Sequence, residues 1–317
     1  MDILKFALRK LIGGIPLILG VTFISFLLMV YFGPDKTYEL LGKNPTAEEI
    51  AEVRHELGYD QPFFKRYAHY LKEMVTLDFG HSEATGEKVS SILKRTMPIS
   101  LLVILPGFIL GNVIAIILGL VAAWYRGTWV DKTIMVGSVI GMSISFLVVI
   151  IAFQILFSSS YGLGWFPVRG WEVHDIPSYL YYVTVPTLAT IFVALGYNTR
   201  FYRAVLVEEM NKDHVRTARA FGASPQSIMI KGVLKNAMVP IITRIMFSIP
   251  LVVVSGSLLI ESYFGIPGIG KVTFDAITGG DQPILKAIVG LTAALFVVVL
   301  IATDILYRVF DPRVELK

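Results

Sequence analysis

Residues 201–240 read FYRAVLVEEMNKDHVRTARAFGASPQSIMIKGVLKNAMVP, a polar and basic stretch in a chain that is otherwise mostly apolar. Its first half, residues 203–221, has the composition of a helix. Gly222 can adopt the positive φ that ends a helix, and Ser224 and Pro225 are favoured at the N-cap and the first position of the next one. The pattern predicts a helix–turn–helix hairpin that docks on a partner.

Composition places the rest of the chain in a membrane. Of the 317 residues, 55% are hydrophobic and 16% are charged, and the mean hydropathy is +0.67. Ordinary domains carry about 25% charged residues. The net charge of +4 resides in short loops and forms no continuous stripe, so we expect no nucleic-acid partner. The chain has no cysteine, which excludes disulfides, zinc–thiolate sites and cysteine nucleophiles.

The apolar runs predict membrane-spanning helices. The first, residues 11–32, is longer than the roughly 7–15 residues of a signal-peptide core and is followed by Gly33-Pro34-Asp35 without a small-residue cleavage site. Five further runs have the length of about 20 residues that a bilayer core demands. They are residues 99–124, 134–157, 178–199, 238–260 and 284–307.

Charge in the connections predicts the orientation. Cations concentrate in the second and fourth connections, whereas the third and fifth are net negative, so the positive-inside rule places the hairpin and both termini in the cytoplasm. The fold class is therefore an all-α polytopic membrane protein with six transmembrane helices. Its parts are residues 1–33 (first span), residues 34–98 (an extracytoplasmic helical insertion) and residues 99–317 (a core that includes the hairpin, residues 200–240).

The insertion and the last external loop carry local signals. Thr46 is a suitable N-cap for a surface helix, and residues 63–75 predict a second helix. Residues 265–271, GIPGIGK, have the spacing of a phosphate loop, but Val272 stands where Mg²⁺ binding needs Ser or Thr. A tight turn is the preferred interpretation. The histidines lack metal-ligand spacing and no catalytic constellation is present, so we expect neither a metal site nor an enzyme.

Three polar residues lie within predicted spans. Asn112 and Gln154 are candidates for lining a translocation path, although side chains of this kind also form hydrogen bonds between helices. Asp304 lies close to the cytoplasmic end of the last span, where we expect it to cap a helix or to pair with an arginine.

Four blocks of sequence resemble one known family. VRTARAFGASPQSIMIKGVLKNAMVP resembles the cytoplasmic EAA loop of binding-protein-dependent ABC importer permeases, and more narrowly their oligopeptide/dipeptide branch. LRKLIGGIPLILGVTFISFLL, LDFGHSEATGEKVSSILKRTMPISLLV and ESYFGIPGIGKVTFDAITGGDQPIL with the closing DILYRVFDPR are similar to further blocks of that branch, in the same order. The usual Glu-Ala-Ala is replaced by Arg216-Thr217-Ala218, and the later proline of the loop by Lys235.

The resemblance implies a type I ABC importer permease architecture and a function. The chain would form half of a translocation path for di- or oligopeptides in a bacterial or archaeal cytoplasmic (inner) membrane. Its partners would be a second homologous permease subunit, two ATP-binding subunits and an extracytoplasmic substrate-binding protein. The chain itself would bind no cofactor, because ATP and Mg²⁺ would reside on the partner ATPases.

The resemblance also implies an ATPase-docking coupling helix. Its residues would be Val215, Arg216, Thr217, Ala218, Arg219, Ala220, Phe221 and Gly222. The small residues among them permit close backbone approach, and Arg216 and Arg219 share a helical face that can pair with acidic groups. The alternative is a basic interfacial helix held by anionic lipid.

Other functions stay open at this point. Permeases of this kind also carry nickel chelates, oligosaccharides or cationic peptides. A self-sufficient channel or secondary transporter would show inverted repeats or ionisable residues at mid-membrane, and neither is evident. A structural component that anchors the binding protein through residues 34–98 is a third reading.

Overall fold

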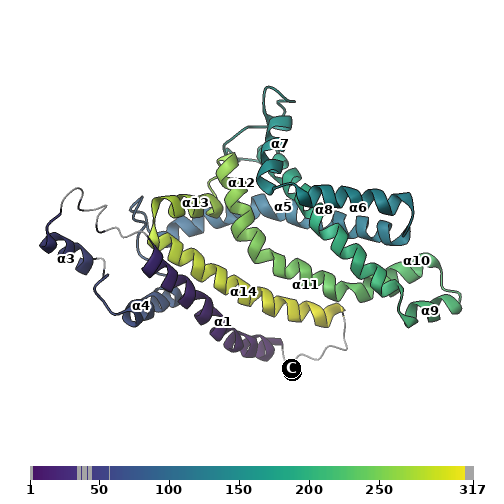
Figure 1. Cartoon of the computed structure of the whole chain (residues 1–317), viewed down its shortest axis with the longest axis horizontal. Helices are drawn as coiled ribbons and strands as arrows, with labels where there is room; N and C mark the ends of the chain where they lie inside the picture. Colours follow the sequence, from purple (N-terminus) through teal and green to yellow (C-terminus); the bar gives the residue numbers. More distant parts are fainter. Residues whose placement is uncertain (1–2, 34–36, 38–40, 42–44, 57, 311–317) are drawn as a thin grey trace. The chain divides into compact units, whose positions relative to one another are not determined.

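The computed structural model describes residues 3–33, 37, 41, 45–56 and 58–310 (Figure 1). The Gly-Pro-Asp-Lys end of the first span and the closing Asp-Pro-Arg fall largely or wholly outside these residues. The chain divides into two units, Met1–Leu8 with Thr96–Lys271 and Val298–Lys317, and Arg9–Arg95 with Val272–Val297. In the described residues every named element is helical.

Five helical runs are long and apolar enough to cross a membrane. They are α1 (Ile3–Phe32, its apolar part from Arg9), α5 (Val89–Trp124), α8 (Ile176–Met210), the run Pro225–Phe264 and α14 (Gln282–Phe310). A bent pair of helices would make a sixth span. The all-helical fold is thus confirmed, with five to six candidate spans.

The span predicted for residues 134–157 is broken in the structure. Two helices occupy this region, α6 (Trp129–Ser143) and α7 (Phe146–Ser158), and they are bent by 100°. Ile144 between them has extended backbone angles, φ −88° and ψ 130°. Both helices pack against α8, so the bend lets one apolar stretch cover two parts of the same long helix.

The run Pro225–Phe264 contains irregular turns. It is composed of α10 (Pro225–Ser227), the π-helical η1 (Ile228–Leu234), α11 (Lys235–Leu251), the π-helical η2 (Val252–Gly256) and α12 (Ser257–Phe264). The η2 turn begins two residues after Pro250, and a proline within a helix removes one backbone hydrogen-bond donor.

Two apolar clusters form the core of the larger unit. One gathers around Val103, Ile150, Val185 and Ile260, from α5, α7, α8 and α12. The other joins α5, α8 and η1 to α9 (Asp213–Ala220) and α11. This second cluster includes Ala115, Tyr202, Leu206, Val215, Met229, Val233 and Ile241. The hairpin is therefore part of the packed body of this unit.

The turn predicted at residues 265–271 is confirmed, and the carboxylate of Glu261 binds the backbone N–H groups at its end. α13 (Ile269–Gly279) begins in this turn, and its first amides need acceptors. Glu261 Oε2 accepts the N–H groups of Gly270 (2.7 Å) and Lys271 (3.2 Å), and Ser100 Oγ accepts that of Ile269 (2.7 Å). The donors that a phosphate would use are thus occupied by the chain's own side chains.

The smaller unit contains the two helices predicted for the insertion, α3 (Ala47–Glu56) and α4 (Phe63–Thr76). Thr46 caps α3 reciprocally with Glu49: each backbone N–H bonds the other's side chain, at 2.8 and 3.3 Å. α4 packs on α1 through aromatic rings, with Tyr70 stacked on Phe26 at 5.3 Å. Burial raises the pKa of the Tyr70 hydroxyl, which donates to the Lys286 carbonyl of α14.

Candidate functional site

The hairpin begins with an elbow that the sequence does not predict. The single helix expected for residues 203–221 is wrong, because α8 ends at Met210 and α9 begins at Asp213. The buried carboxylate of Glu209 lies at this elbow, 2.5 Å from Lys212 Nζ and 3.5 Å from His214 Nε2. The hydrogen bond to Glu209 raises the pKa of Lys212. Lys212 and His214, from the far side of the break, thus hold the start of α9 against Glu209.

The turn after α9 matches the sequence prediction. Gly222 has φ +76°, which is the left-handed conformation that glycine adopts without steric cost. Its N–H donates to the Arg219 carbonyl at 3.0 Å, and the Ala223 N–H donates to the Ala218 carbonyl at 3.1 Å, the Schellman pattern of a helix end. Ser224 Oγ then accepts the Ser227 N–H at 3.3 Å and caps the next helix.

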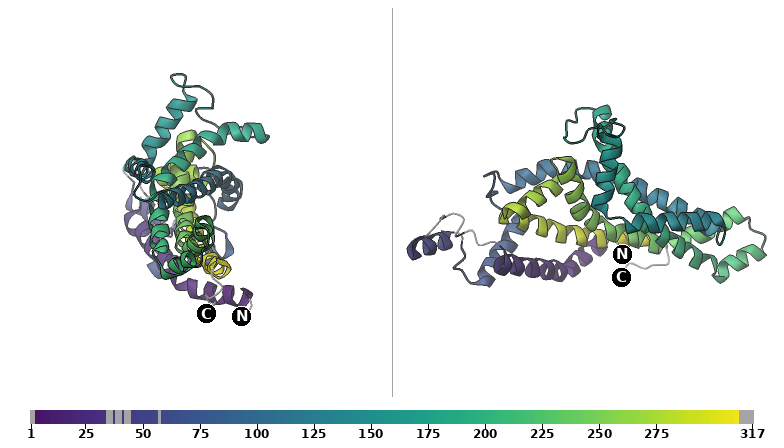
Figure 2. Two further views of the ribbon diagram at one scale, coloured as in Figure 1. Left: turned by 90° about the vertical axis from the view of Figure 1, so that its right-hand side faces the viewer. Right: turned by 45° about the horizontal axis from the view of Figure 1, so that its top comes forward.

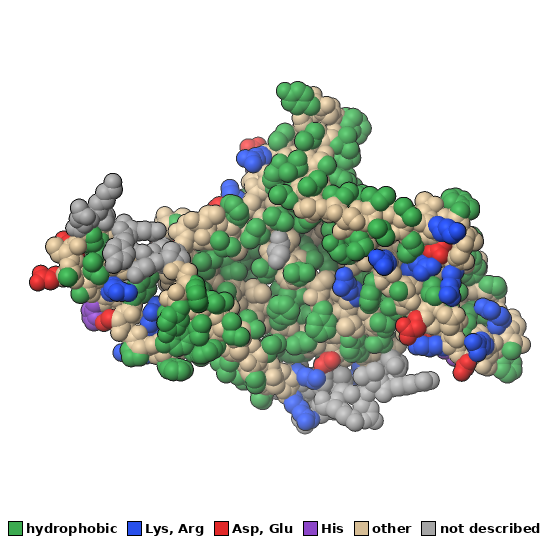
Figure 3. All heavy atoms as spheres, viewed as in Figure 1, with side chains coloured by type: hydrophobic (Ala, Val, Ile, Leu, Met, Phe, Trp, Pro, Cys, Tyr) green, Lys and Arg blue, Asp and Glu red, His purple; other side chains and the backbone are tan. Residues whose placement is uncertain are grey.

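α9 is anchored along one side and free on the other. Val215 is 2% exposed and belongs to the core cluster of the hairpin, whereas Phe221 is 87% exposed. Arg216 and Arg219 are also exposed, and Arg216 makes only a 3.4 Å contact with Asp213. In Figures 1 and 2, α9 and α10 form the tip beyond the end of α8. Figure 3 shows Lys and Arg side chains gathered at this tip.

An ion pair braces the base of the hairpin. Asp131, in the first turn of α6, accepts from Arg203 of α8 through Nε at 2.5 Å and Nη2 at 2.6 Å. The Gly127 N–H donates to the same carboxylate at 2.9 Å. Asp131 is buried, and a bidentate arginine contact fixes both distance and orientation. This pair was not predicted from the sequence, although an acidic residue at the start of an apolar helix is a usable signal.

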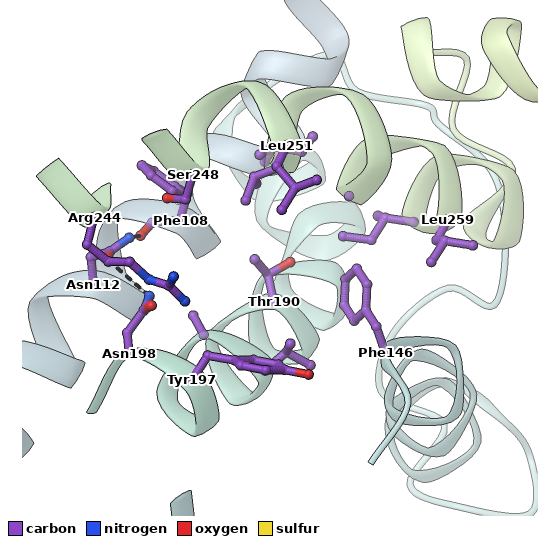
Figure 4. A pocket seen from close by; sticks show the side chains of 16 residues that line it. Phe108, Asn112, Phe146, Thr190, Tyr197, Asn198, Arg244, Ser248, Leu251 and Leu259 are labelled. Atoms are coloured by element: carbon purple, nitrogen blue, oxygen red, sulfur yellow. Dashed lines mark hydrogen bonds between the residues drawn. The ribbon is translucent and has the colours of Figure 1, made fainter. Parts of the chain in front are cut away.

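A cavity of about 440 Å³ lies nearer the middle of α8, with walls from α5, α7, α8, α11, η2 and α12 (Figure 4). Its walls are mostly apolar, and the side chains of Asn112, Asn198 and Arg244 lie together at one end. Asn112 Oδ1 accepts from the Tyr202 hydroxyl (2.5 Å) and from Asn198 Nδ2 (3.1 Å). Asn112 thus lines a cavity and also bonds between helices.

The other candidate path residue lies elsewhere. Gln154 is buried in α7, donates to the Val168 carbonyl at 2.6 Å and is not among the residues that line this cavity. Arg244 was missed, although it is an ionisable residue within a predicted span and the reasoning applied to Asp304 would have found it. Asp304 itself is partly buried near the end of α14. The described residues contain no group of three or more potential metal ligands of the His, Cys, Asp and Glu types.

Two family models together match nearly the whole chain. Residues 3–103 match the N-terminal part of binding-protein-dependent transport system membrane components, and residues 115–316 match the inner membrane component itself. The chain belongs to the binding-protein-dependent transport system inner membrane component family. It is thus a permease of a binding-protein-dependent ABC importer, a multi-pass inner-membrane subunit that is not an ATPase. Members of the family carry no bound cofactor, and their partners are a binding protein and an ATPase.

Relatives match this permease over almost their full length. A putative peptide transport system permease protein of Brucella abortus (strain 2308) is 32% identical over 311 residues, which cover 97% of this chain and 98% of the relative. A probable peptide ABC transporter permease protein of Sinorhizobium fredii is 29% identical, covering 98% and 99%. A glutathione transport system permease protein of Salmonella typhimurium is 30% identical, covering 99% and 100%.

Proposed function

We propose that this permease forms half of a translocation path for peptides, which an external binding protein delivers. The relatives named for peptide or glutathione transport support this substrate class, because they match the permease from end to end. The other half of the path would come from a second, homologous permease subunit. Six spans in a type I arrangement require α6 and α7 to act together as one bent span.

We further propose that Val215–Gly222 is the coupling helix on which one of two ATPase subunits docks. The observation that carries this assignment is the asymmetry of α9. Val215 is buried against the body, while Arg216, Arg219 and Phe221 are exposed and accessible to a partner. The positive-inside rule puts this hairpin and both termini in the cytoplasm and residues 34–98 outside.

Helix α8 connects the docking tip with the cavity. α8 supplies Thr190, Tyr197 and Asn198 to the cavity wall and ends at the Glu209 elbow beside α9. Closure of the ATPases on ATP would move α9, and the contacts of Glu209 with Lys212 and His214 would transmit that movement to α8. The ion pair between Asp131 and Arg203 would carry it on to α6. The cavity would then open alternately to the two sides of the membrane.

A charge reversal tests the docking assignment. Arg216→Glu places a negative charge on the free face of α9 and is expected to abolish ATP-driven uptake of radiolabelled trialanine by the complete transporter in liposomes. Lys132→Glu makes the same charge change at an exposed site outside the hairpin and serves as the matched control. We expect the control to transport at the wild-type rate. Normal uptake by Arg216→Glu would contradict the assignment of α9 as the docking helix.

A further inference from the structure

The polar end of the cavity is built around one arginine. Arg244 is on α11, within the candidate span Pro225–Phe264, and its side chain lines the cavity with Asn112, Asn198 and Ser248. Phe146, Leu251 and Leu259 lie away from this end (Figure 4). The cavity therefore has one cationic, hydrogen-bonding end and one apolar end.

Arg244 forms no ion pair with the described carboxylates. Among the described residues, no carboxylate oxygen lies within 4.0 Å of its guanidinium. Its guanidinium lies over the ring of Phe201, with Cζ 5.6 Å from the ring centroid. Ionisable residues within membrane spans are costly and usually face a partner or a water-filled path, so an arginine without an anionic partner indicates a site for an anion.

The groups at this end favour an anion over a cation. Asn112 Oδ1 already accepts two hydrogen bonds, and Asn112 Nδ2 donates to the Phe108 carbonyl. The guanidinium keeps its fork of N–H donors, which matches the two oxygens of a carboxylate. A volume of about 440 Å³ is within the range of about 300–1,000 Å³ that small-molecule sites occupy.

We propose that Arg244 binds the carboxylate of a transported peptide, with the apolar end of the cavity receiving its side chains. This assignment rests on the proposed function, because it names the part of a peptide that the permease recognises. The substrate class follows as peptides with a free C-terminal carboxylate. Asn198 positions the site through its hydrogen bond to Asn112.

The test compares two peptides that differ only at the C-terminus. The complete transporter, with its binding protein, is reconstituted in liposomes, and uptake of radiolabelled trialanine is compared with that of trialanine amide. Each peptide is used at a concentration that saturates the binding protein, whose affinity for both is measured separately. We expect the wild type to transport the free acid about tenfold faster or more, the usual effect of a charged hydrogen bond.

Two variants remove the anion site in different ways. Arg244→Gln deletes the charge, while Ser248→Asp leaves Arg244 in place and supplies a competing carboxylate one helical turn away. Both are expected to slow uptake of the free acid far more than uptake of the amide, so that the two rates become equal. Arg200→Gln removes an exposed arginine of α8 that does not line the cavity and should keep the wild-type ratio.

The outcomes separate this proposal from the proposed function. A wild-type transporter that takes up neither peptide contradicts peptide transport itself. If the wild type takes up trialanine and both cavity variants keep its preference, only the Arg244 site is overturned. Equal slowing of acid and amide, or loss of assembly of the subunits in both variants, would likewise assign Arg244 to subunit contact and overturn the site.

Discussion

Asp131 and Arg203 form the ion pair at the base of the hairpin, and removing either partner should destabilise the permease measurably. The Asp131 side chain is 5% exposed and that of Arg203 is 24% exposed. Loss of one partner of a buried pair costs about 3–5 kcal/mol, since the other charge is left without a partner. The partial exposure of Arg203 places the expected loss near the lower end, about 3 kcal/mol for Asp131→Ala.

A double-mutant cycle isolates the pair. Asp131→Ala, Arg203→Ala and the double variant are unfolded reversibly by SDS in mixed micelles, and helix content is followed by circular dichroism. Because the second substitution removes a charge that has already lost its partner, we expect the double variant to lose about 2 kcal/mol less than the sum of the single losses. Wild-type stability is the reference in each case.

An exposed pair provides the control for this cycle. Arg216 and Asp213 on α9 have side chains that are 75% and 95% exposed, and they are 3.4 Å apart. Exposed pairs of this kind contribute little, so their cycle should show no measurable coupling. Additive losses at Asp131 and Arg203, within about 0.5 kcal/mol, would refute the bracing role of the ion pair.

Further predictions concern the turn before α13 and the insertion. Gly270→Ala would place a Cβ 2.3 Å from the carbonyl carbon of Ser257, so we expect loss of folded protein from the membrane fraction, whereas Gly279→Ala, with no atom within 4 Å, should accumulate normally. His55 lies 2.7 Å from Asp60, and this hydrogen bond raises the pKa of the imidazole above its usual 6.5. The contact should therefore hold below pH 6.5 and weaken as the pH rises through the raised pKa; an NMR titration should show the higher midpoint, and Asp60→Asn should return it to the usual value.

Local chemistry made part of the hairpin predictable. Gly222 and Ser224 act on neighbouring backbone groups, so their roles could be derived from the sequence alone. The break before Asp213 could not, because it depends on the burial of Glu209 and on its contacts with Lys212 and His214. Burial of that carboxylate is a result of tertiary packing, which the residues nearby in sequence do not encode.

The bend between α6 and α7 escaped prediction for a related reason. The stretch around Ile144 is apolar throughout, so its composition indicates one continuous span, while the bend follows from the packing of both helices on α8. The cavity could likewise be predicted only in part, because its make-up depends on tertiary packing. Asn112 could be proposed from its polarity within a span, but its grouping with Asn198 and Arg244 depends on how α5, α8 and α11 pack.

The docking role of α9 is tested most directly by finding which molecule contacts its tip in the working transporter. The chain has no cysteine, so Phe221→Cys introduces a single thiol at an 87% exposed position. Benzophenone-4-maleimide attached there is expected to photo-cross-link to an ATPase subunit, while the same probe at Tyr161→Cys, in an exposed loop beyond α7, should not. A transport-competent protein in which position 221 reacts only from outside the cell, or cross-links only to lipid, would contradict the docking role of α9.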